Sequence, residues 1–324
     1  MTEYTHPGHD ADSPTEIPYR GWRQIARRVW NQIDEHNIWL VAAGVAFFAI
    51  MSVFPTLIAM ISIYGLVSDP VTVELQLNDM SGVLPYDVRT LMSEQLKAIV
   101  TAATGSLTFG VATSLLLTLW TISTGVSYLI TALNIVYGED ETRSFFKLRL
   151  LAVKLTLFII FGVLIALATI AALPAFLAFA GLGTLTETIL RYSRWPLLGV
   201  GTVVFLAVIN RFAPNRRDSK WRWVSVGSVL ATLVWLIASA LFSFYVSNFG
   251  NYNEIYGSLA TPIVLMTWLY LSSFLLLVGA TVNAETEHQT TRDSTVGKPK
   301  PMGKRGAYVA DTVPHKLMPN TPNA

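Results

Sequence analysis

The chain contains no cysteine and few charged residues. The absence of Cys excludes disulfides, thiolate catalysis and cysteine-ligated metal sites. Charged residues make up 14% of the sequence, whereas ordinary soluble domains carry about 25%. The hydrophobic fraction is 52% and the mean hydropathy is +0.47. This composition does not suit a surface that faces water on all sides, and it indicates a membrane protein.

The residue clusters that enzymes need are also missing from the sequence. Metal-dependent hydrolysis requires several His, Asp, Glu or Cys ligands that converge on one ion. No two of the five histidines have a spacing on one helix that would hold a metal, and no phosphate-binding loop or nucleophile elbow occurs. We therefore expect no enzyme activity, no catalytic residue, no metal and no cofactor. The histidines are His6, His9, His36, His288 and His315.

Long apolar runs are abundant instead. The hydrocarbon core of a bilayer requires roughly 20 apolar residues of helix, and six segments reach about that length without a charge in their central parts. The first is over-long and contains Pro55, which should kink or break it. The fourth is the shortest. The segments are Ile38–Val67, Leu107–Tyr137, Leu150–Ala180, Pro196–Phe212, Trp223–Val246 and Leu259–Ala284.

Basic residues predict how these spans are oriented, because Lys and Arg are enriched in cytoplasmic loops. With six crossings and both ends inside, 18 of the 23 Lys and Arg residues lie on the cytoplasmic side and 4 on the other. The remaining one, Lys154, lies near the inner end of a span. The fold class predicted is therefore all-α: a polytopic transmembrane helical bundle of about six spans.

Segments outside the spans complete the predicted organisation. Residues 1–19 are expected to be a disordered cytoplasmic leader, and 286–324 a disordered basic tail, since both are polar and rich in Pro, Gly, Thr or Lys. Residues 38–285 form the six-span membrane domain. Between the first two spans, the residues after Pro85 have a helical apolar stripe and predict a helix on the outer face.

An amphipathic helix is predicted over residues 20–37. Its apolar side chains recur at helical spacing and arginines occupy the other face, which is typical of an interfacial helix attracted to anionic headgroups. The alternatives are a lipid sensor and a plain membrane anchor, and the anchor is the commoner use.

The polar residues inside the spans are neutral. In the second span Trp120, Ser127 and Asn134 belong to a row of polar and small side chains at helical spacing. Such a row lines a hydrated or headgroup-accepting groove, or it lets helices pack closely and hydrogen-bond, which is the commoner use. Proton relays and ion-coupled pumps need charged groups at mid-membrane. The central parts of these spans have none, which disfavours a pump driven by a buried carboxylate.

Several ordered segments resemble the YihY/BrkB family of bacterial membrane proteins. They are Ala42–Pro55, Leu119–Ser123, Ala132–Tyr137, Arg211–Pro214, Tyr252–Ala260, Trp268–Tyr270 and Gly279–Glu285. The resemblance covers about residues 20 to 288. One departure is that Thr281 and Val282 stand where the family usually has Glu-Leu.

The resemblance implies a six-span protein of the bacterial inner membrane. Some members look like transporters or flippases of lipids and lipid-linked envelope precursors, and an older label, ribonuclease BN, is attached to the family. The expected function is transfer of such an amphiphile, with a non-transporting scaffold as the alternative and a ribonuclease as the disfavoured third. Membrane lipids are the expected partners, with anionic headgroups at Arg20–Arg28; a homo-oligomer stays open, and nucleic acid is not expected. Candidate residues for a path are Pro55, Trp120, Ser127, Asn134, Tyr252, Tyr256, Gly257, Trp268, Asn283 and Glu285.

Overall fold

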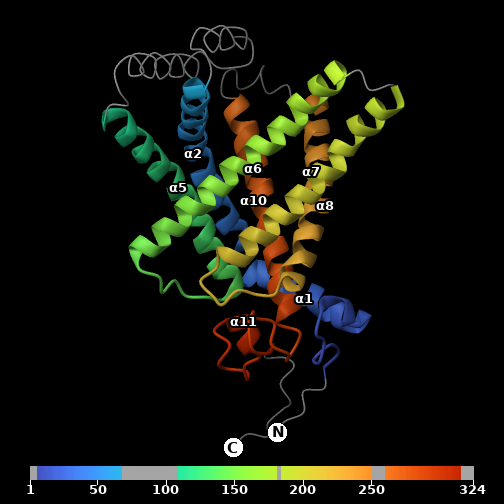
Figure 1. Cartoon of the computed structure of the whole chain (residues 1–324). Helices are drawn as coiled ribbons and strands as arrows, with labels where there is room; N and C mark the ends of the chain where they lie inside the picture. Colours follow the sequence, from blue (N-terminus) through green and yellow to red (C-terminus); the bar gives the residue numbers. More distant parts are fainter. Residues whose placement is uncertain (1–5, 68–108, 181–183, 250–259, 315–324) are drawn as a thin grey trace, which may run out of the picture.

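The computed structural model describes residues 6–67, 109–180, 184–249 and 260–314 (Figure 1). Most of these residues form helices, and the β-type pairing among them is an isolated bridge between Ser219 and Thr295. In chain order the elements are η1 (Pro14–Glu16), α1 (Tyr19–Glu35), α2 (Ile38–Val67), α5 (Phe109–Tyr137), α6 (Phe145–Ala180), α7 (Thr184–Phe212), α8 (Trp221–Phe249), α10 (Ala260–Glu287) and α11 (Tyr308–Asp311).

The number of spans agrees with the sequence analysis. Five helices, α5 to α8 and α10, are long and apolar enough to cross a membrane. A sixth span comes from α2, which is bent by 64° from α1. Asn37 lies at this bend with φ 49, a left-handed conformation that Asn tolerates better than most residues. An all-α bundle of about six spans is therefore confirmed.

Two helices begin five or more residues before their apolar runs predict. The α6 helix begins at Phe145 instead of Leu150, and α7 begins at Thr184 instead of Pro196. Apolar length marks the part of a helix that lies in hydrocarbon, but backbone hydrogen bonds continue the helix beyond that part. Pro196 is accommodated inside α7, as membrane helices often allow when neighbouring groups satisfy the freed backbone.

Among the described helices, the last membrane helix, α10, packs against more of the other elements than any other helix does. It packs against α1, α2, α5 and α8, while α6 and α7 complete the ring through α5 and α8. Both α1 and α11 lie at the same end of the bundle (Figure 1). We call this the inner end, because the distribution of Lys and Arg predicts that it faces the cytoplasm. The opposite halves of the helices are called the outer half.

The predicted amphipathic helix is present as α1, but its apolar stripe faces the protein. Gly21, Ile25, Val29 and Ile33 are buried, and α1 packs against α10 and α2. Bundle surface, rather than lipid, therefore covers this stripe. The arginines at positions 20, 23 and 27 are exposed, which leaves them free to meet headgroups.

The two tails differ from the expectation of disorder wherever the structure describes them. Residues 288–314 fold against the inner end, and the backbone N–H of Thr291 donates to the carbonyl oxygen of His9 (2.7 Å). Arg305 is 5% exposed, and its guanidinium donates to the carbonyl oxygens of four residues: Thr291, Arg292, Lys300 and Ala310. Polar composition predicted disorder, whereas these hydrogen bonds order the segment. The outer-face helix predicted after Pro85 lies outside the described residues.

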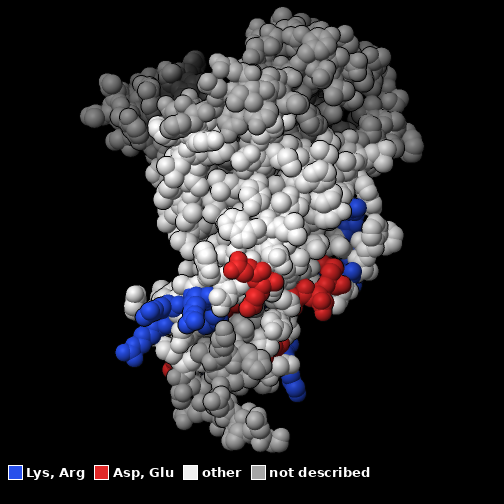
Figure 2. Space-filling model, turned by 180° about the vertical axis from the view of Figure 1, so that it is seen from behind, with Lys and Arg blue, Asp and Glu red and all other residues white. Residues whose placement is uncertain are grey.

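Charge is distributed over the surface as a membrane position requires. On the face shown in Figure 2, blue and red side chains gather across the lower part, and a wide uncharged surface lies above them. Exposed apolar side chains are common on the membrane helices, for example Leu117, Phe161, Ile237 and Leu241. Such a belt suits contact with lipid chains.

Candidate functional site

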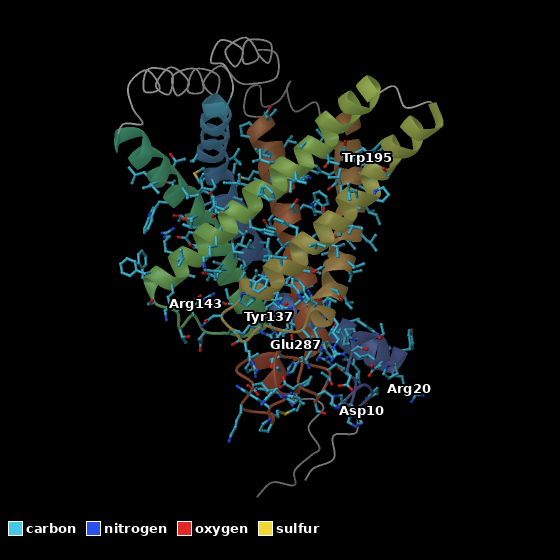
Figure 3. All side chains as sticks on the ribbon, in the orientation of Figure 1. Asp10, Arg20, Tyr137, Arg143, Trp195 and Glu287 are labelled. Atoms are coloured by element: carbon cyan, nitrogen blue, oxygen red, sulfur yellow. The ribbon has the colours of Figure 1, made fainter. Side chains whose placement is uncertain are left out.

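A buried ion pair lies at the inner end of α10. The Arg216 guanidinium binds the Glu287 carboxylate through both terminal nitrogens, with Nη1 3.0 Å from Oε2. Their side chains are 2% and 0% exposed. Ser294 Oγ also donates to Glu287 (2.6 Å), and the guanidinium lies 5.2 Å from the centre of the Tyr137 ring. Figure 3 shows Tyr137 and Glu287 at this end, far from Trp195 in the outer half.

A second ion pair joins α1 to the same turn of α10. Arg28 Nε donates to Glu285 Oε2 at 2.5 Å, and its Nη2 donates to Gln289 Oε1 at 2.7 Å. Gln289 in turn donates to the carbonyl oxygen of Pro7 (2.6 Å). This chain of contacts connects the N-terminal segment, α1 and the end of α10.

Two asparagines hold the helices together near these pairs. Asn283, which is fully buried, accepts from the backbone N–H of Gly227 (2.7 Å) and donates to the carbonyl oxygen of Val224 (3.1 Å). Asn134 accepts from the backbone N–H of Asn215 (2.7 Å) and donates to Glu141 (3.0 Å). Each amide therefore uses its donor and its acceptor to connect α5 or α10 to a neighbouring element.

The fold also shifts the pKa values of charged residues in the connections at the inner end. Hydrogen bonds from Arg143 hold the pKa of the Glu141 carboxyl below its ordinary value. Burial raises the pKa of Glu139, although the N–H of Tyr308 donates to it at 2.7 Å. Burial alone would lower the pKa of Arg216, but the adjacent Glu287 carboxylate more than compensates and raises it. Ion pairs and hydrogen bonds thus close the inner end.

The outer half of α10 is packed quite differently. From Ser273 to Glu287 many of its side chains are buried, as are those of every residue from Gly279 onward. Between Thr261 and Thr267, by contrast, the side chains are exposed or partly exposed, with Ile263 at 36% and Met266 at 42%. The helix with the most packing partners at the inner end is thus exposed in its outer half. The neighbouring helices separate around it in that direction (Figure 1).

The structure brings only part of the predicted path together. Asn134, Asn283 and Glu285 lie at the inner end, where they hold elements together. Trp268 lies closer to the outer end of α10 and packs edge-on against Trp235, with 5.8 Å between the ring centres. Pro55 lies within α2. That these positions line one path stays a prediction.

The remaining candidate residues do not join either of these groups. The Ser127 hydroxyl donates to the carbonyl oxygen of Ser123, one turn earlier in α5 (3.0 Å), so its hydrogen bond stays within the helix. Trp120 is 44% exposed on the outside of the bundle. Tyr252, Tyr256 and Gly257 lie outside the described residues.

We call Arg28, Arg216, Glu285, Glu287 and Gln289 the inner cluster. Sequence reasoning assigned Arg28 to lipid headgroups, whereas the structure pairs it with Glu285. It missed the roles of Arg216, Glu287 and Gln289. A signal was available, since two carboxylates at the end of the last span follow a loop rich in arginine. The orientation rule alone already explained that loop, and no pattern says which arginine meets which carboxylate.

Within the described ranges, no group of three or more His, Cys, Asp or Glu side chains is close enough to hold a metal ion. The carboxylates of the inner cluster are bound to arginines. Their geometry suits mechanical closure of a helix bundle and does not form a general acid–base pair facing solvent.

Comparison with known proteins places this architecture in a family. A family model described as Virulence factor BrkB matches residues 29–303. The Bacillus subtilis protein YfkH, whose name calls it ribonuclease-like, is 36% identical over 261 residues, covering 75% of this chain and 88% of that protein. A UPF0761 membrane protein of Psychromonas ingrahamii is 26% identical over 263 residues, 80% of this chain and 86% of that protein. No solved structure matches significantly. The chain therefore belongs to the BrkB family of integral membrane proteins.

Proposed function

We propose that this chain is a non-enzymatic protein of the bacterial inner membrane that moves a lipid or a lipid-linked envelope component across the bilayer. The observation that carries the proposal is the two-part packing of α10. Its inner half is sealed by buried pairs and by asparagine contacts, whereas its outer half, around Met266, is exposed. A protein that admits a substrate from one side at a time requires this asymmetry.

The α1 helix supports the choice of an amphiphilic substrate. It is bent by 64° from α2 at the inner end, and its exposed arginines project away from the bundle, as Arg20 does in Figure 3. Anionic headgroups of the cytoplasmic leaflet attract basic residues in such a position. Lipid is therefore the partner that we assign to this face.

A scaffold without transport is the second candidate. The folded inner end favours it, because α1, the loop before α8 and residues 288–314 are joined by many hydrogen bonds and offer a stable surface. A scaffold, however, does not require the exposed outer half of α10.

We do not extend to this chain the ribonuclease description that one relative's name carries. Cleavage of RNA requires a metal cluster or an acid–base pair that reaches solvent. Glu285 and Glu287 are each bound to an arginine and buried.

The test is lipid transfer in proteoliposomes, using a fluorescent phospholipid and a fluorescent polyprenyl phosphate as probes. The proposal predicts that protein-containing vesicles transfer at least one probe between leaflets faster than protein-free vesicles. Met266→Trp, which adds bulk to the outer half of α10, should slow this transfer. Leu164→Trp adds similar bulk to an exposed position on α6 and should leave it unchanged. Equal rates with and without folded protein would reject transport and favour the scaffold.

A further inference from the structure

Arg149 has no carboxylate partner among the described residues. Arg28, Arg143 and Arg216 each bind a glutamate. Arg149 lies in the second turn of α6, inside the segment that qualifies as a membrane span. A full positive charge near a membrane boundary is costly unless an anion or water meets it. The question is which group meets this one.

The contacts of Arg149 hold its guanidinium in place without neutralising it. Nη1 donates to Ser123 Oγ and to Thr124 Oγ1 on α5, both at 3.1 Å, and lies 3.4 Å from the carbonyl oxygen of Trp120. Cζ lies 4.1 Å from the centre of the Trp120 ring and 5.8 Å from that of Phe145. One nitrogen thus joins α6 to α5, and the indole supports the flat face of the group.

This arrangement leaves donors for a ligand. A guanidinium has five N–H donors, and the contacts to described residues use Nη1 alone. The guanidinium lies on the lateral surface of the bundle, since Trp120 is 44% and Phe145 59% exposed. The remaining donors, on Nε and Nη2, form an edge that matches two oxygens of a phosphate.

The surroundings indicate a lipid as the source of that phosphate. Phe146 is 80% and Leu150 56% exposed beside the guanidinium in sequence, and together with Phe145 they form an apolar surface suited to acyl chains. Tryptophan and other aromatic rings are favoured at the level of the headgroups. A free anion would gain nothing from this apolar surface.

We propose that Arg149, Trp120 and Phe145 form a binding site for the phosphate of a membrane lipid in the cytoplasmic leaflet, with its acyl chains against Phe146 and Leu150. Ser123 and Thr124 act as positioning residues, because they orient the guanidinium from α5. The site does not depend on transport: a scaffold that selects anionic lipids would use it equally.

The test compares two lipids that differ only in phosphate. Purified protein in detergent is titrated with dioctanoyl phosphatidic acid and with dioctanoylglycerol, and binding is followed by calorimetry. The wild type should prefer the phosphate-bearing lipid by roughly tenfold or more. Arg149→Gln should abolish this preference, and Arg149→Lys should retain only part of it because Lys lacks the two-pronged geometry. Lys154→Gln, which removes a charge from an exposed position one turn further along α6, should keep it.

Inorganic phosphate is the third arm, and it should not displace the lipid at millimolar concentration. Displacement would mean a free-anion site and would overturn the proposal, as would equal preference in the wild type and Arg149→Gln. If Arg149→Gln does not fold, Trp120→Leu takes its place. That variant removes the supporting ring and keeps the hydrogen bonds to Ser123 and Thr124, so it should weaken the preference several-fold. An unchanged preference in folded Trp120→Leu would contradict the assignment.

Discussion

Gly227 of α8 and Gly279 of α10 lie against each other with their backbones in contact. A Cβ atom built on Gly227 would lie 2.0 Å from the carbonyl oxygen of Gly279, and one built on Gly279 would lie 2.8 Å from that of Gly227. No rotation of a side chain relieves a clash between a methyl group and backbone. This crossing brings Gly227 within reach of Asn283, whose Oδ1 accepts from the Gly227 N–H.

Gly227→Ala should therefore push α8 and α10 apart and destabilise the bundle. The cost of forcing a methyl group into a packed contact is about 1–3 kcal/mol, and the loss of the Asn283 contact would add to it. Gly201→Ala, on α7, meets nothing within 4 Å and should be neutral or slightly stabilising. Thermal unfolding in detergent compares the two. Equal melting temperatures for both variants would refute the close-contact argument.

The buried pair of Arg216 and Glu287 predicts a large effect of removing one partner. Glu287→Gln leaves the guanidinium buried without a counter-charge, and breaking such a pair typically costs about 3–5 kcal/mol. The double variant Arg216→Leu with Glu287→Leu removes both charges and should recover much of that loss. Glu141→Gln affects the pair of Arg143 and Glu141, whose side chains are 18% and 27% exposed. It should lower the stability less, because solvent screens this pair. A double variant less stable than Glu287→Gln would contradict this account.

The N-terminal segment should detach in mild acid. Burial, followed by the positive charges nearby, lowers the pKa of His6 below its usual 6.5, and its Nε2 lies 2.8 Å from the Gln289 carbonyl oxygen. The detached state therefore binds a proton more readily than the folded one. Attachment is complete above about pH 6.5 and weakens as the pH falls below it.

Hydrogen exchange at the Thr291 amide, which donates to His9, reports this detachment. The charged or titratable groups that face His6 are His9, Arg28 and His288. Their contribution to the pH response has to be separated from that of His6. His6→Gln cannot titrate and should flatten the pH response. The same response in His6→Gln would assign it to the other histidines.

The purified protein should not cleave tRNA, with or without divalent metal. The reason is that Glu285 and Glu287 are committed to arginines, and in the part of the chain that the structure describes no three His, Cys, Asp or Glu side chains are close enough to hold a metal ion. The measurement is a cleavage assay on material from size exclusion. Cleavage that co-purifies and disappears in a point variant of this chain would refute the prediction.

The spans were predictable from the sequence because apolar length is a local property. Tyr137, for instance, ends both the predicted second span and α5. The direction of the α1 stripe was not predictable, since Ile25 and Val29 suit a protein surface and a lipid surface equally. Helix ends were also misplaced, as at Phe145, because hydropathy does not detect backbone hydrogen bonds beyond the hydrocarbon.

The candidate site was less predictable, because it depends on contacts between distant segments. Arg216 and Glu287 are 71 residues apart, and one sequence does not show that they meet. Asn283 and Glu285 were recognised as polar residues at the end of a span, but their partners, Gly227 and Arg28, lie on other elements. Arg305 was assigned to a disordered tail by composition, whereas its carbonyl contacts exist only in the folded chain.

The proposed function requires a bundle that is closed at its inner end and that water reaches around the outer half of α10. Since the chain has no cysteine, Thr267→Cys and Thr281→Cys each provide a single thiol, at an exposed and at a buried position of this helix. A membrane-impermeant maleimide added outside intact cells or spheroplasts should label Thr267→Cys, because reaction requires a hydrated thiolate. Thr281→Cys should react only after denaturation. An unreactive Thr267→Cys that reacts once denatured would place this face in lipid or packed protein and contradict the account.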